Sequence, residues 1–272
     1  MIRPRRPRSA RALAAATGVL LLSACGSGST TGGTASGPTS STPGGVTGTV
    51  TVFAAASLKE SFTAIGTAFE AAHPEVEVVF NFGPSSGLAT SITQGNPADV
   101  FASASPTTMD TVVRAGEAAD TPATFARNQM EIAVPTANPA RVTGVADLAR
   151  SGVKVALCQA QVPCGKVAAQ VFANAKLTVT AISEETDVKA VLTKVSLGEV
   201  DAGVVYVTDV KAASAGGKVT GIEIPATVNA STSYPIASLT TAPNPAGAAA
   251  FTAYVLSDQG RSALAAAGFA AP

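Results

Sequence analysis

Residues 49–69 read TVTVFAAASLKESFTAIGTAF and join a strand directly to a helix. The first six residues are apolar or β-branched, which is typical of a buried strand. Apolar side chains then recur at helical spacing, at Leu58, Phe62, Ile65 and Phe69. Ser57 and Glu60 stand at the junction with the spacing of a capping box, which would close the helix N-terminus. The stretch therefore predicts a strand, a turn of small residues and a helix.

The same alternation continues along the chain. Further strands are predicted at residues 76–82, 99–103, 130–134, 153–157 and 203–207. Further helices are predicted at residues 88–94, after Pro106, at 165–174, at 188–195 and around 251–255. Strands that alternate with helices predict an α/β fold with a mainly parallel sheet. In such sheets, ligands bind at the carboxyl ends of the strands, where helices begin.

Four junctions between strands and helices are rich in small residues. They read AAAS at 54–57, GPSSG at 83–87, VPCG at 162–165 and ETDV at 185–188. Small residues let a ligand approach the backbone, and a helix N-terminus offers free N–H groups and partial positive charge. These junctions therefore suit an anion. Serine and glycine are also ordinary cap and turn residues, so the composition alone leaves both interpretations open.

The N-terminal residues have the pattern of an export signal. Five arginines lie within the first eleven residues, and an apolar run follows at 12–22, which is short for a membrane span. The run ends in LSAC at 22–25, which resembles the lipobox of bacterial lipoproteins. We predict a signal peptide at 1–24, a lipidated Cys25 and a flexible linker at 25–45. An ordinary cleaved signal is the alternative. The lipid would anchor the protein at the outer, extracytoplasmic face of the cell membrane.

The charge of the exported chain excludes a common class of partner. Loss of the five leader arginines leaves 13 basic against 18 acidic side chains, a net charge of −5. Nucleic-acid binders are normally basic, so we expect no nucleic-acid partner. An acidic protein that binds an anion must use neutral donors.

Five stretches, taken in order, resemble the molybdate-binding proteins of ABC transporters. They are VFAAASL at 52–58, NFGPSSGL at 81–88 with NPADVFAS at 96–103, VPCG at 162–165, DV at 187–188 and GVVY at 203–206. The resemblance covers nearly the whole exported chain. It implies the two-lobed, type II periplasmic-binding-protein fold, with the ligand in the cleft between lobes. Lobe 1 would hold residues 46–127 and 235–272, and lobe 2 would hold 128–234.

The resemblance also implies a set of oxyanion-binding residues. Ser57 and Ser85 would each offer a hydroxyl and a backbone N–H, Cys164 and Val188 a backbone N–H, and Tyr206 its phenolic hydroxyl. All are neutral donors, so the site would suit a fully ionised oxyanion such as molybdate or tungstate and disfavour hydrogen phosphate. Sulfate or another oxyanion is the alternative ligand.

The same resemblance implies partners and a mode of action. The protein would be a monomer that delivers its ligand to an ABC permease and its ATPase, with no cofactor, no metal cation and no reaction. A surface sensor with this fold is a second possibility. The third is a serine hydrolase, because residues 83–87 match the G-x-S-x-G nucleophile elbow. Its triad would need a later histidine, and the only histidine is His73.

Two further clusters have open interpretations. Cys158 and Cys164 are two free thiols or a disulfide, and export favours the disulfide. Glu184, Glu185 and Asp187 could bind Ca²⁺ or, as we expect, stabilise the N-terminus of the following helix.

Overall fold

The computed structural model describes residues 45–272. The predicted signal peptide, Cys25 and nearly all of the predicted linker lie outside the described residues. Within 45–272, no helix has both the length and the apolar character needed to span a bilayer.

The strands form one mixed sheet in the order β2-β1-β3-β9-β4-β7-β5-β6, with β8 paired to β4. Their bounds are β1 (Gly48–Ala55), β2 (Val76–Gly83), β3 (Val100–Ala102), β4 (Ala123–Pro135), β5 (Val155–Cys158), β6 (Ser183–Glu185), β7 (Ala202–Tyr206), β8 (Val219–Glu223) and β9 (Ser231–Ser238). Strand β1 runs parallel to β2 and β3, and β5 runs parallel to β6 and β7. The pairings of β4 with β7, β8 and β9, and of β9 with β3, are antiparallel.

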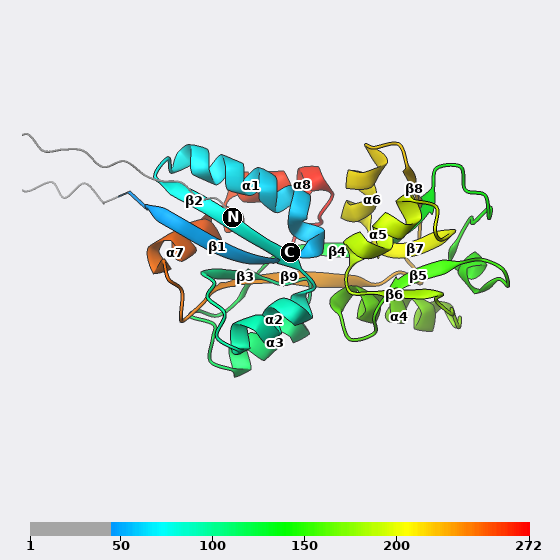
Figure 1. The fold of residues 1–272 in the computed structure, drawn as a ribbon, viewed down its shortest axis with the longest axis horizontal. Coiled ribbons are helices and arrows are strands. Elements are labelled where there is room, and N and C mark those ends of the chain that lie inside the picture. The colour runs from blue at the N-terminus through cyan, green and yellow to red at the C-terminus, as the bar shows by residue number, and fades with distance from the viewer. Residues whose placement is uncertain (1–44) are drawn as a thin grey trace, which may run out of the picture. The chain divides into compact units, whose positions relative to one another are not determined.

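Helices cover both faces of this sheet (Figure 1). They are α1 (Lys59–Ala72), α2 (Ser85–Thr93), α3 (Pro106–Arg114), α4 (Pro163–Ala175), α5 (Val188–Ser196), α6 (Val207–Ser214), α7 (Pro245–Leu256) and α8 (Asp258–Ala267), with short 3-10 turns η1 (Ala56–Leu58) and η2 (Val145–Ala149). Alternate strand residues face opposite layers. Val52 and Ala54 pack with α1, α7 and α8, whereas Phe53 packs with α2 and α3.

The buried apolar side chains divide between two halves of the described chain. One core joins the second part of β4 with β5, β7, α4 and α5. The cores of the other half lie on the two faces of β1, β3 and β9. Figure 1 shows the two groups of elements toward opposite ends of the long strands β4 and β9, which run from one group into the other. The predicted two-lobed α/β architecture is confirmed.

The predicted capping box at Ser57 is wrong. Residues 56–58 form the 3-10 turn η1, and α1 begins at Lys59 with no side-chain cap. The turn buries Ser57, which is 4% exposed, and its hydroxyl bonds to Tyr234 rather than to the helix. Glu60 pairs instead with Lys189 of α5, with Oε2 and Nζ 2.7 Å apart.

Candidate functional site

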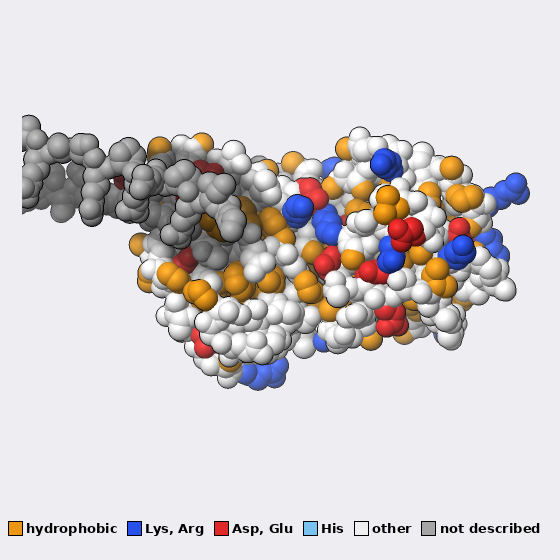
Figure 2. All heavy atoms as spheres, viewed as in Figure 1, with side chains coloured by type: hydrophobic (Ala, Val, Ile, Leu, Met, Phe, Trp, Pro, Cys, Tyr) orange, Lys and Arg blue, Asp and Glu red, His pale blue; other side chains and the backbone are white. Residues whose placement is uncertain are grey.

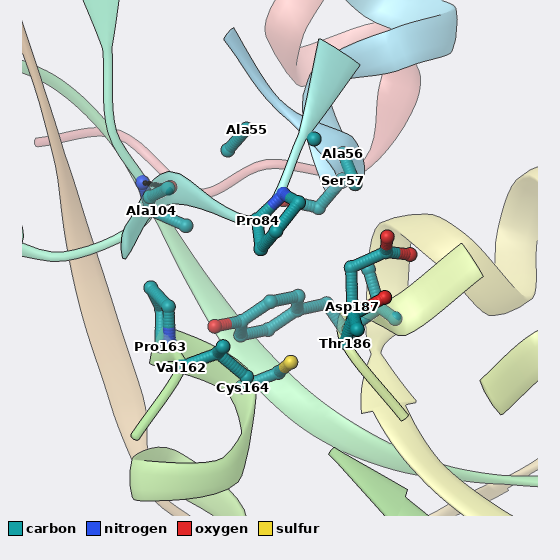
Figure 3. Close-up of a pocket in the computed structure, with 14 residues that line it drawn as sticks. Ala55, Ala56, Ser57, Pro84, Ala104, Val162, Pro163, Cys164, Thr186 and Asp187 are labelled. Atoms are coloured by element: carbon teal, nitrogen blue, oxygen red, sulfur yellow. Dashed lines mark hydrogen bonds between the residues drawn. The ribbon is translucent and has the colours of Figure 1, made fainter. Parts of the chain in front are cut away.

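A small pocket lies where strand ends and helix starts from the two halves meet. Its cavity volume is about 20 Å³ on the measure by which one water molecule needs roughly 10–15 Å³, so the pocket has room for about one water molecule. Its lining residues are Ala55, Ala56, Ser57, Gly83, Pro84, Ser85, Ala104, Val162, Pro163, Cys164, Thr186, Asp187, Val188 and Tyr206. The pocket therefore brings together all five predicted ligand residues. In Figure 3, Ala55, Pro84 and Ala104 face Val162, Pro163 and Cys164 across the pocket.

Each side of the pocket comes from the junctions that the sequence singles out. On one side, β1 ends in the turn that holds Ser57, and β2 ends just before Ser85, the first residue of α2. On the other side, Cys164 is the second residue of α4, and Val188 is the first residue of α5. Tyr206 ends β7. Small lining residues such as Ala55 and Gly83 keep the space open and the backbone within reach.

The two serine hydroxyls already hold one protein partner each. Ser57 Oγ lies 2.9 Å from Tyr234 Oη. Ser85 Oγ accepts a hydrogen bond from Ala104 N at 3.0 Å. Both serines are buried, being 4% and 2% exposed. A hydroxyl that accepts one bond keeps its own proton for a ligand.

Tyr206 places at the pocket a buried hydroxyl that makes no hydrogen bond of standard geometry within the described residues, although the nearby Tyr234 hydroxyl contributes to its raised pKa. The residue is 1% exposed, and its hydroxyl has no hydrogen-bond partner among residues 45–272. Burial raises the pKa of the Tyr206 hydroxyl well above its usual range, so the group stays protonated at neutral pH. A buried, unpaired polar group costs free energy, which a ligand in the pocket would recover.

The start of α5 lines the pocket at Asp187 and Val188 and is capped by the Asp187 side chain. Asp187 Oδ1 accepts from the backbone N–H groups of Lys189 and Ala190, at 2.8 and 3.1 Å. The N–H of Val188 is not among those that Asp187 caps. The predicted role of Asp187 at this helix N-terminus is confirmed. Its negative charge is engaged by the helix, which limits its repulsion of an anion beside it.

The loop before α4 is closed by a covalent bond in the structure. The sulfur atoms of Cys158 and Cys164 are bonded, and the two Cα atoms lie 5.8 Å apart. The bond joins the end of β5 to the first turn of α4, which carries the backbone N–H of Cys164.

The lining is neutral apart from Asp187. Among the described residues, no Lys, Arg or His lines the pocket. Lys189 lies outside the lining and pairs with the fully buried Asp209, with Nζ and Oδ1 2.9 Å apart. On the face shown in Figure 2, acidic and basic side chains are interspersed and form no basic patch. An anion bound here would interact with dipoles and N–H groups of helix N-termini rather than with a cation.

The nucleophile-elbow pattern lacks a nearby base. Ser85 does sit between a strand and a helix, but its oxygen accepts the N–H of Ala104. His73 follows the last residue of α1, and its ring centroid lies 4.5 Å from that of Phe69. It is not a lining residue. Among residues 45–272, no group of three or more His, Cys, Asp or Glu is placed to hold a metal ion.

Sequence reasoning missed two groups that contact the site residues, Tyr234 and the backbone N–H of Ala104. Tyr234 lies in β9, which the sequence analysis did not predict, and its contact with Ser57 spans 177 residues. Ala104 follows a predicted strand, but no local pattern marks its N–H as a partner of Ser85.

The chain belongs to the family of bacterial extracellular solute-binding proteins, whose model matches residues 50–270. Its fold is the two-lobed type II fold of periplasmic binding proteins.

The chain is also similar to individual proteins of known sequence or structure. The chain is 43% identical over 251 residues to the molybdate-binding protein ModA of Mycobacterium tuberculosis, over 92% of this chain and 93% of that protein. It is 33% identical over 202 residues to the putative ABC transporter substrate-binding lipoprotein YvgL of Bacillus subtilis, over 72% and 74%. The periplasmic molybdate-binding protein of Azotobacter vinelandii superposes with a TM-score of 0.72 at 19% identity, over 82% of this chain and 99% of that chain. At that identity the superposition supports the fold alone.

Proposed function

We propose that this protein captures molybdate, and also tungstate, in the pocket and delivers it to an ABC importer. The observation that carries the proposal is the buried Tyr206 hydroxyl, which has no partner in residues 45–272 and lines a pocket of neutral donors. The relative named as molybdate-binding, which is matched over 92% of this chain and 93% of its own length, supports the choice of anion.

The chemistry of the donors favours a fully ionised tetrahedral oxyanion. Hydroxyl groups of Ser57, Ser85 and Tyr206 and the N–H groups of Cys164 and Val188 can all point a proton at the ligand. A protonated oxyanion would bring its own O–H and find no acceptor for it. Hydrogen bonds to an ionised acceptor are about twice as strong as neutral ones, and exclusion of water strengthens them further. Pocket size would then separate molybdate and tungstate from the smaller sulfate.

The wider organisation of the proposed protein follows from the same assignment. Lobe 1 would hold residues 46–127 and 235–272 and lobe 2 residues 128–234, so that the chain crosses between lobes in β4 and β9. The lobes would close on the anion by a hinge motion and carry out no reaction. Lipid on Cys25 would hold the monomer at the outer face of the membrane, beside its permease and ATPase. The Cys158–Cys164 bond would stiffen the loop before α4.

Calorimetric titration of residues 46–272 tests the proposal. The anions are molybdate, tungstate, sulfate and phosphate. We expect one-to-one binding of molybdate and tungstate, with weak or undetectable binding of the other two. Tight sulfate binding would support the alternative ligand, and no response to any of the four would refute the oxyanion assignment.

A matched pair of variants tests the observation that carries it. Tyr206→Phe removes the unpaired hydroxyl and should weaken molybdate binding by roughly 1–3 kcal/mol. Tyr254→Phe removes a hydroxyl from a partly exposed tyrosine of α7 that does not line the pocket, and it should leave binding unchanged. Equal affinities of the two variants would remove Tyr206 from the site.

A further inference from the structure

The two serines that line the pocket share an arrangement that their own sequence motifs do not explain. Each hydroxyl oxygen lies within hydrogen-bond distance of a second polar group of the protein. For Ser85 the donor is Ala104 N, at 3.0 Å. For Ser57 the partner is Tyr234 Oη, at 2.9 Å, from a strand 177 residues further along the chain.

The direction of the Ser85 bond is fixed by chemistry. A backbone N–H can only donate, so Ser85 Oγ is the acceptor and its single proton is free to point elsewhere. Because Ser85 lines the pocket, a bound anion is the natural acceptor for that proton. Ser85 is thereby held as a donor.

The Ser57 bond could run in either direction, and two considerations select one. A phenol is more acidic than an aliphatic alcohol, so the Tyr234 hydroxyl is the better donor of the two. A fully ionised anion in the pocket repels the lone pairs of Ser57 and attracts its proton. Both effects make Tyr234 the donor and leave the Ser57 proton for the ligand.

We propose that Tyr234 is a positioning residue, which donates to Ser57 Oγ and so makes Ser57 an obligate donor to the bound oxyanion. The proposal rests on the proposed function. Tyr234 would also determine specificity, because a Ser57 oxygen already occupied by Tyr234 accepts poorly from the O–H of a protonated oxyanion. With the N–H of Ala104 acting on Ser85 in the same way, the site would reject protonated oxyanions through groups that act on the two serine oxygens.

The surroundings of Tyr234 hold its hydroxyl in place. The residue is 0% exposed, and its ring packs against three aromatic rings: Phe269, Tyr206 and Phe125, with centroids 5.3, 6.0 and 6.2 Å away. Burial raises the pKa of Tyr234, which keeps its proton in place at neutral pH. A phenylalanine would keep these ring contacts and remove only the hydroxyl.

The test compares molybdate with arsenate at neutral pH, because hydrogen arsenate carries a proton and molybdate does not. The full exported chain is titrated as wild type, Tyr234→Phe, Ser57→Ala and the double variant, with Tyr254→Phe as the control. We expect Tyr234→Phe to weaken molybdate binding roughly 2- to 10-fold, the effect of one neutral hydrogen bond. Arsenate binding should not fall with it, so the preference for molybdate over arsenate narrows.

The double variant separates positioning from a general structural effect. If Tyr234 acts through Ser57, adding Tyr234→Phe to Ser57→Ala should change molybdate affinity less than about 2-fold. The proposal is overturned if Tyr234→Phe behaves like Tyr254→Phe, if it weakens both anions equally, or if its effect persists in the Ser57→Ala background. A wild-type protein that binds neither molybdate nor tungstate refutes the proposed function itself, before any variant is compared.

A second replacement covers the case in which Tyr234→Phe does not fold. Replacing Tyr234 by a fluorinated tyrosine keeps the ring and the hydroxyl and makes the O–H more acidic. As a stronger donor to Ser57, it should widen the preference for molybdate over arsenate. An unchanged or narrower preference would contradict the proposal.

Discussion

Gly165 offers a sharp test of how the second half presents its side of the pocket. It is the third residue of α4, directly after Cys164. A Cβ atom at Gly165 would lie 2.0 Å from the carbonyl oxygen of Gln159 and 2.9 Å from that of Cys158. Ordinary contact begins at 3.4 Å, so the helix and the loop would have to separate by about 1.4 Å. Both neighbours are backbone atoms, so no side-chain rotation relieves the clash.

The structure resists that separation in two ways. The disulfide ties Cys158 to Cys164, and Gln159 N donates to Glu185 O at 2.8 Å. We therefore expect Gly165→Ala to lower the free energy of unfolding by about 1–3 kcal/mol, the usual cost of overpacking. For a chain of this size each kcal/mol corresponds to about 2–4 °C in Tm. Molybdate binding should weaken as well, because the displaced turn carries the backbone N–H of Cys164.

Gly87 provides the matched control. It is the third residue of α2, on the other side of the pocket, and a Cβ there would meet only Pro84 Cγ, at 3.4 Å. Alanine is favoured over glycine inside a helix by about 0.5–1 kcal/mol, so Gly87→Ala should be neutral or stabilising. Urea denaturation followed by circular dichroism gives both values. Equal stabilities of Gly165→Ala and Gly87→Ala would refute the reasoning.

Phe62→Ala should lower the free energy of unfolding by about 3–5 kcal/mol, because the ring is 0% exposed, and urea denaturation measures it. Lys189→Met should lower the free energy of unfolding by about 3–5 kcal/mol, because it leaves the buried Asp209 without its cation. Glu60→Gln should lower it by about 1 kcal/mol or less, because the Glu60 side chain is 49% exposed. Burial lowers the pKa of Lys189, but Asp209 and Glu60 outweigh that effect and raise it. The stability that the Lys189 ion pairs contribute should therefore persist up to about pH 10 and be lost as the pH rises through the raised pKa. Denaturation midpoints measured at alkaline pH test this. Reduction of the disulfide, whose cysteines lie 6 residues apart in sequence, should lower the free energy of unfolding by about 2 kcal/mol. Mass spectrometry of the non-reduced protein should find Cys158 and Cys164 bonded to each other, with no free thiol on either.

The parts of the fold that the sequence predicts are those with local signals. The strand at residues 49–54 corresponds to β1, and Pro106 opens α3 as expected. Each depends on an apolar run or a residue with a fixed backbone preference, and neither needs knowledge of a distant partner. The same holds for the small-residue junctions that line the pocket.

The missed parts depend on distant partners. Strand β9 contains three serines and Pro235, which weakens its strand pattern. The strand tolerates Pro235 because this residue pairs with Thr124 beside an irregularity in β4. The carbonyl of Pro235 still accepts a hydrogen bond from Ser103 N. The first half of β4 carries the polar residues 127–129, so only its apolar end was predicted.

Ser57 shows the limit of local rules most clearly. Its spacing to Glu60 satisfies a capping pattern, but its hydroxyl lies against Tyr234 and Glu60 pairs with Lys189. The hydrogen-bond partner of a hydroxyl depends on which polar groups the fold brings near it, and a short sequence motif does not contain that information.

The place of β9 in the sheet orders the folding of the two halves in time. Strands β4 to β8 follow one another along the chain, so the buried residues of their core are all present once the chain has been made as far as Ile224. Strand β3 has no partner on one side until residues 231–238 arrive and insert between it and β4. An open strand edge pairs readily with other chains. A chain that ends before Ser231 would therefore keep strands β4 to β8 but leave the edge of β3 without a partner. The C-terminal strand β9 thus protects the N-terminal strands from pairing with other chains.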